Sequence, residues 1–138
     1  MKVLIILFSF FAIASCSSIA AEKSCSREEA IRAETEASSL PDWNSLYKAF
    51  LRFGHCDDGA ISEGYSETVG RLLANDWELF EKLRTLSLRD KRFEQFVIRH
   101  IDDTVPSDYL NKIIDNVNQH CSSDSKRLCK LIYDAATR

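Results

Sequence analysis

Two His-Cys dipeptides, His55-Cys56 and His120-Cys121, are the residues of this sequence best suited to chemistry. Histidine nitrogen and cysteine sulfur both bind zinc, so the two dipeptides together offer four ligands. Zinc sites, however, commonly take their ligands from pairs separated by about two to five residues, and adjacent side chains at a helix end do not easily face one ion. We therefore expect no metal and no other cofactor, and we interpret both histidines as surface residues near helix ends.

A cysteine nucleophile would be the other use of these thiols, and it would need a separate base such as His100. The chain has five cysteines, of which Cys16 lies in the N-terminal segment discussed below. The other four form an even set that pairs off in an oxidising compartment and leaves no spare thiol. The sequence also contains no Gly-x-Ser-x-Gly, no phosphate-binding loop and no His-Glu-x-x-His. We therefore expect that the protein is not an enzyme.

The four remaining cysteines allow three pairings, and we expect Cys25–Cys56 and Cys121–Cys129. The second pair flanks the polar turn at 122–125, so its closure would join the end of one helix to the start of the next. The first pair would hold an N-terminal helix against the rest of the domain. A loop of about 30 residues closed in this way contributes roughly 3–4 kcal/mol in the chain-entropy model.

An acidic set, Asp57, Asp58, Glu63 and Glu67, follows the first His-Cys dipeptide. Such carboxylates could form a catalytic pair or a calcium site. At a helix start, however, Asp57 and Asp58 have a simpler role, because an aspartate there caps free N–H groups and complements the helix dipole. The capping role is the one we expect for at least one of these two aspartates.

The apolar residues that must position these groups recur with helical spacing almost throughout the chain. We expect helices at about 26–38, 42–54, 57–74, 76–86, 90–101, 110–117 and 128–132. Ser26 and Glu29 have the spacing of a capping box, and Asp76 is expected to cap the fourth helix. The glycines at 59, 64 and 70 are expected to permit close helix packing. The predicted fold is all-α, one compact bundle of six to seven helices stapled by disulfides.

The first twenty residues have the pattern of a secretory signal peptide, with Lys2 followed by an apolar run over 3–14. Residues 18–20 suit cleavage by an ordinary signal peptidase, and 21–138 would then be a single helical domain. The alternative is a lipobox ending at Cys16, which would anchor the same domain to a membrane by lipid. Without the signal the net charge is about −4, and no basic stripe is present, so we expect no nucleic-acid partner.

One stretch of the sequence resembles a known family. The resemblance rests on residues 54–67, Gly-His-Cys-Asp-Asp-Gly-Ala-Ile-Ser-Glu-Gly-Tyr-Ser-Glu, and on Val69, Arg71, Leu72 and Leu73 after them. Residues 96–102, Phe-Val-Ile-Arg-His-Ile-Asp, and the Cys121-to-Cys129 spacing extend it over most of the mature chain. These features are similar to the immunity proteins that neutralise the fourth class of amidase effectors of the type VI secretion system.

The resemblance implies an all-helical periplasmic protein, a homodimer in this family, which protects its cell from the toxin of its own strain or of sister cells. The partner would be a secreted papain-like amidase that cleaves peptidoglycan cross-links and whose active-site cleft the immunity protein blocks. Asp57, Asp58, Glu63 and Glu67 are the residues we expect to orient this partner, since an acidic surface complements a basic wall-binding enzyme. The alternative function is a periplasmic or lipid-anchored helical structural or binding protein without a toxin partner.

Overall fold

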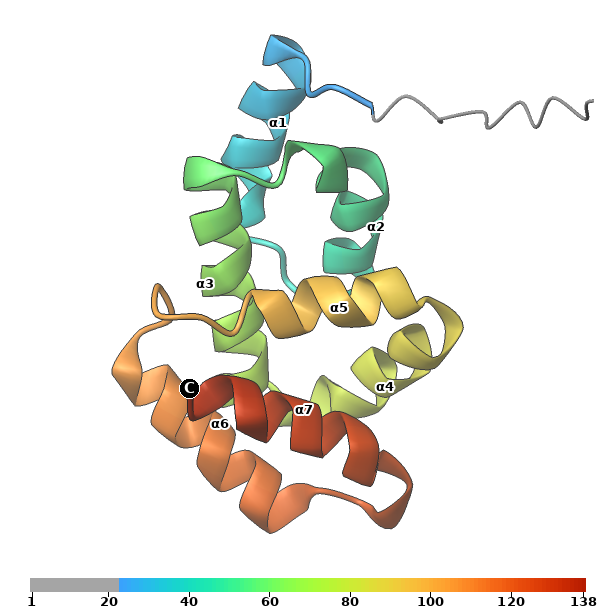
Figure 1. Ribbon diagram of the computed structural model, residues 1–138, viewed down its shortest axis with the longest axis vertical. Coiled ribbons are helices and arrows are strands. Elements are labelled where there is room, and N and C mark those ends of the chain that lie inside the picture. The colour runs from blue at the N-terminus through green and yellow to red at the C-terminus, as the bar shows by residue number, and fades with distance from the viewer. Residues whose placement is uncertain (1–22) are drawn as a thin grey trace, which may run out of the picture.

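The computed structural model describes residues 23–138 as seven α-helices joined by short turns (Figure 1). No β-strand occurs in this part of the chain, and the expected all-α fold of six to seven helices is confirmed. The predicted signal peptide, residues 1–20 with Cys16, lies outside the described residues. The helices are α1 (Arg27–Ala37), α2 (Trp43–Phe53), α3 (Gly59–Asn75), α4 (Phe80–Arg89), α5 (Lys91–Arg99), α6 (Ser107–His120) and α7 (Lys126–Ala136), with short 3₁₀ turns η1 (Gly54–Cys56), η2 (Trp77–Leu79) and η3 (Ser123–Ser125).

The capping box that the sequence predicts at the start of α1 is confirmed. Ser26 and Glu29 form the capping box of α1, each side chain accepting from the other residue's backbone N–H. Asp42 caps α2 by accepting from the Ser45 N–H at 2.8 Å. The role predicted for Asp76 is wrong, because its carboxylate pairs with Arg71 Nη1 at 3.1 Å and makes no side-chain cap. The turn η2 instead precedes α4.

The centre of the bundle is α3, which packs against α1 along one part of its length and against α6 along another (Figure 1). Its buried face carries Tyr65, Val69 and Leu72. Close approach to α1 requires Gly64, where a Cβ atom would lie 2.8 Å from the Ala37 Cβ. The packing role predicted for Gly59 is wrong, since nothing lies near its missing Cβ and its φ of +52° is the conformation that only glycine adopts freely.

An aromatic cluster between α2, α3 and α5 fills the core beside α3. The Phe96 ring lies 5.1 Å from the ring of Tyr65 and 5.0 Å from that of Phe50, and Phe93 continues the cluster toward Tyr47. Edge-to-face and tilted pairs of this kind add to the stabilisation from burial alone. Because α5 contributes two of these rings, the cluster fixes the position of α5 against α2 and α3. It thereby also fixes Arg99 and His100, the polar residues at the end of α5.

The last helix, α7, is held by one covalent and one ionic connection. The Cys121–Cys129 disulfide links the end of α6 to α7. Arg127 of α7 donates from both terminal guanidinium nitrogens to the buried carboxylate of Glu94 on α5, with Nη1 2.9 Å from Oε1 and Nη2 bonded to Oε2. Burial would raise the pKa of Glu94, but the hydrogen bonds from Arg127 and Lys91 outweigh it and lower the pKa. None of the described helices is long and apolar enough to cross a membrane.

Candidate functional site

The η1 turn carries the first His-Cys dipeptide and connects α2 to α3, and the acidic set begins directly after it. Cys56 is buried and forms a disulfide with Cys25, just before α1. With Cys121–Cys129, this bond confirms both expected pairings. Two intramolecular disulfides are consistent with an oxidising, exported compartment.

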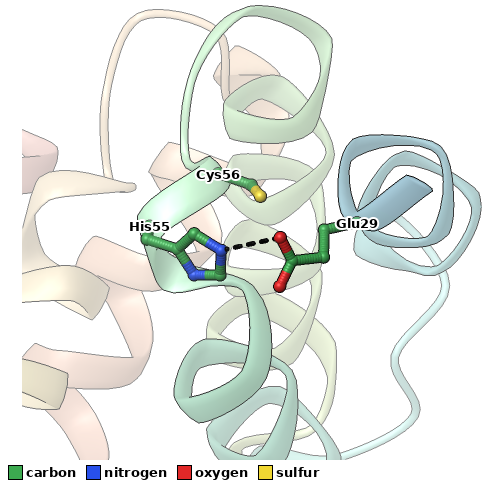
Figure 2. Close-up of side chains that lie close together, drawn as sticks. All are labelled: Glu29, His55 and Cys56. Atoms are coloured by element: carbon green, nitrogen blue, oxygen red, sulfur yellow. Dashed lines mark ion pairs between the residues drawn. The ribbon is translucent and has the colours of Figure 1, made fainter. Parts of the chain in front are cut away.

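His55 and Cys56 turn their side chains to the same side of η1, toward Glu29 of α1 (Figure 2). His55 Nε2 lies 3.4 Å from Glu29 Oε2, and ligand atoms of Glu29, His55 and Cys56 all lie within 4.8 Å of one another. The sequence leads us to expect that adjacent residues here do not easily face one ion and that His55 lies on the surface; the two side chains instead turn to the same side, and that of His55 is only 15% exposed. A 3₁₀ turn packed against α1 brings the two side chains together. We name Cys25, Glu29, His55 and Cys56 the Cys56 corner.

The carboxylate of Glu29 is the most extensively hydrogen-bonded group of this corner. Lys23 donates to Oε1 at 2.6 Å, and the Ser26 backbone N–H and hydroxyl donate to Oε2 at 3.1 and 2.9 Å. These donors lower the pKa of Glu29 to about 2, Lys23 contributing most and Ser26 next. Glu29 is therefore a carboxylate anion at any physiological pH.

Asp57 points away from solvent, and the structure gives it a role that the sequence did not reveal. Its side chain is 6% exposed and accepts from Arg99 Nη2 at 2.6 Å and from His100 Nε2 at 3.0 Å. Burial alone would raise the pKa of Asp57, but the hydrogen bonds and charges of His100 and Arg99 outweigh it and lower the pKa. The cap of α3 is Asp58, which is exposed and accepts from the Gly59 N–H at 2.8 Å. Asp57 is thus neither the cap nor an exposed partner-binding carboxylate.

Ser62, His100 and Asp57 resemble a hydrolase triad in composition but not in geometry. In a triad the nucleophile and the carboxylate bind opposite ring nitrogens of the histidine. Here Ser62 Oγ, at 3.3 Å, and the Asp57 carboxylate both approach Nε2, while Nδ1 donates to the Phe96 carbonyl at 2.7 Å. The ring of His100 is 1% exposed. This cluster ties α5 to the start of α3, and the geometry does not support His100 as the base of a nucleophile.

Two of the predicted partner-binding residues, Glu63 and Glu67, lie one turn apart on the exposed side of α3, beside α1. They line a groove of about 530 Å³ that also contains Glu34 of α1. None of these three carboxylates forms an ion pair or hydrogen bond with another of the described residues. We name this feature the acidic groove; its lining residues are Glu34, Ser38, Ala60, Glu63, Gly64, Glu67, Thr104, Pro106 and Tyr109.

Sequence reasoning missed Glu34, because nothing local connects α1 to this surface. The signal that could have found it is Gly64, since a glycine on the apolar-periodic α3 lets α1 approach closely and carries Glu34 to the edge of the groove. The loop after α5 closes the other end. There Asp102 accepts from Ser66 Oγ at 2.9 Å and from the Thr104 N–H at 2.9 Å, which orders the loop.

Comparisons with family models, with curated proteins and with solved structures find no match to this chain. The likeness to amidase immunity proteins accordingly depends on the residues quoted above. Among the described residues, the acidic groove is a surface feature whose three carboxylates have no ion-pair partner.

Proposed function

We propose that this protein is a periplasmic immunity protein that binds a type VI secreted, papain-like peptidoglycan amidase and blocks its active-site cleft. The observation that carries the proposal is the acidic groove. It lies on α3, in the segment that resembles the family, and Glu34, Glu63 and Glu67 lack a cationic partner among the described residues.

A basic partner surface suits this groove for a physical reason. Carboxylates that are already paired within a protein gain little from a second cation, whereas unpaired ones leave a negative potential that attracts basic residues. An enzyme that binds the cell wall, itself an anionic polymer, is expected to carry such basic residues. The charge of the groove would speed the encounter and orient the enzyme, and packing of apolar anchors would supply most of the affinity.

Inhibition by occlusion requires only that the bound surface is rigid. The groove meets this condition because both of its walls are anchored: α1 by the Cys25–Cys56 disulfide and α3 by the contacts of Asp57 with α5. Export through a signal peptide at residues 1–20 would bring the protein to the compartment where the amidase acts. A homodimer would present two equivalent grooves, one on each protomer.

The test is to measure binding of the chain from Ala21 to an amidase with Cys and His catalytic residues encoded next to its gene. Replacing two groove carboxylates, as Glu63→Gln with Glu67→Gln, should lower the association rate by about tenfold and reduce its salt dependence. The matched control is Glu78→Gln with Asp115→Asn, which changes the charge equally at exposed positions outside the groove.

The outcomes separate the proposal from its alternative. If the groove variant binds as tightly and as fast as the parent, the groove is not the interface. If the parent itself binds no such amidase, the alternative of a helical structural or binding protein without a toxin partner is favoured.

A further inference from the structure

The Cys56 corner has the composition of a metal site that the disulfide keeps closed. It holds two cysteines, one histidine and one carboxylate, which are zinc ligands in proteins. The ring nitrogen His55 Nε2 is buried and, among the described residues, makes no regular hydrogen bond; its nearest polar neighbour is Glu29 Oε2 at 3.4 Å. Buried polar groups in native proteins normally have a partner, so a nitrogen without one, aimed into a set of potential ligands, needs an explanation.

We propose that reduction of the Cys25–Cys56 disulfide converts the Cys56 corner into a tetrahedral zinc site. The disulfide takes two electrons and two protons from a dithiol reductant, which becomes a disulfide itself, and two thiols form. Zinc binding then releases both thiol protons, because the thiolate is the ligand. His55 contributes the lone pair of Nε2, and Glu29 contributes a carboxylate oxygen.

The dimensions of the corner fit this coordination. Bond lengths of about 2.0 Å to nitrogen or oxygen and 2.3 Å to sulfur place tetrahedral ligand atoms roughly 3.3–3.8 Å apart. The ligand atoms of Glu29, His55 and Cys56 already lie within 4.8 Å of one another, so each moves by about 1 Å or less. Cys25 is exposed and precedes α1, so its sulfur can move away from Cys56 once the bond between them is broken.

The surrounding charges and donors also suit a zinc ion. Two thiolates and one carboxylate around Zn²⁺ leave one negative charge, which the ammonium of Lys23, 2.6 Å from Glu29 Oε1, balances. The Ser26 N–H and hydroxyl hold the Glu29 carboxylate in place, as partners of metal-ligating carboxylates commonly do. A chain that reaches an oxidising compartment still reduced would therefore bind zinc here until the disulfide forms.

The test uses the chain from Ala21 with Cys121→Ser and Cys129→Ser, so that only the corner cysteines remain. After reduction it is titrated with Zn²⁺, and with Co²⁺ as a spectroscopic probe of geometry. We expect one metal per reduced chain, a thiolate-to-cobalt charge-transfer band with the strong visible bands of a tetrahedral complex, and no binding by the oxidised chain. His55→Ala should weaken metal binding by at least about tenfold, because mutating even a residue that only supports a metal ligand commonly lowers the affinity by that factor.

The matched control is His120→Ala in the same chain, which removes a histidine outside the Cys56 corner and should leave binding unchanged. Helicity measured by circular dichroism accompanies each titration, so that a reduced chain that unfolds is still informative: restoration of the helical signal by zinc supports the site. The proposal is overturned if the reduced chain takes up no zinc, if the cobalt complex is octahedral without a thiolate band, or if His55→Ala binds as tightly as the His120→Ala control.

Discussion

Replacing Asp57 by asparagine tests the finding that this residue ties the start of α3 to α5. The substitution keeps the size of the side chain and removes its charge. Its amide can present the oxygen to either His100 or Arg99, and the NH₂ group then faces the other donor. Since the Asp57 side chain is 6% exposed and His100 is 1% exposed, water does not replace the lost interaction.

The magnitude follows from the two contacts. A hydrogen bond to a charged group contributes about 1.5–3 kcal/mol, and the His100 contact is of this kind and buried. The Arg99 side chain is 63% exposed, so its ion pair adds at most about 1 kcal/mol. We expect Asp57→Asn to lower the free energy of unfolding by about 1.5–4 kcal/mol at pH 6, which corresponds to a fall in Tm on the order of 10 °C.

The assay is urea denaturation followed by circular dichroism, with Asp58→Asn as the matched control. Asp58 is exposed and only caps α3, and asparagine caps as well as aspartate, so the control should stay within about 0.5 kcal/mol of the parent. The pKa of Asp57 is lower in the folded state than in the unfolded state, where it is about 3.9. The stabilisation by the Asp57 carboxylate is therefore fully present above that pH and is lost as the pH falls through the folded-state pKa. The difference between parent and Asp57→Asn should therefore shrink below about pH 4. Equal stability of the two variants at pH 6 would refute the reasoning.

Three further predictions concern the packing of α1 on α3, the disulfides and the proposed homodimer. Gly64→Ala should destabilise the fold by about 1–3 kcal/mol in the same assay, because its Cβ would lie 2.8 Å from the Ala37 Cβ, and a neutral result would mean that α1 and α3 are not so closely packed. Peptide mapping without reduction should find both bridges. Replacing the cysteines of Cys25–Cys56, which are 31 residues apart, should lower the free energy of unfolding by about 3.5 kcal/mol, and replacing those of Cys121–Cys129, which are 8 apart, by about 2.5 kcal/mol. The reverse order would contradict the loop-entropy account. Light scattering at micromolar concentration should give about twice the monomer mass, and a monomer at all concentrations would remove the homodimer from the proposal.

The features that the sequence predicted well are those set by neighbours along the chain. Helical periodicity, the capping box of Ser26 and Glu29, and the Cys121–Cys129 pair across a short turn all depend on residues within about ten positions. The Cys25–Cys56 pair spans a longer distance, but the even number of cysteines left few ways to form it.

The features that the sequence did not predict depend on how distant helices cross. Asp57 and Asp58 are adjacent and identical in type, yet one is buried against α5 and the other caps α3, because the φ and ψ angles at the end of η1 direct their side chains differently. Likewise, Asp76 turns back to Arg71 rather than forward to α4. The convergence of His55 with Glu29 requires the position of α1 on the bundle, which no local pattern contains.

Titration of amidase activity tests the central proposal most directly. The chain from Ala21 is added in steps to the papain-like amidase encoded beside it, and cleavage of peptidoglycan cross-links is measured by the appearance of new peptide ends. An immunity protein that blocks the cleft should reduce the activity in proportion to the amount added and abolish it at a ratio of about one chain per enzyme, as tight binding requires. Undiminished cleavage at about ten chains per enzyme would contradict the proposal.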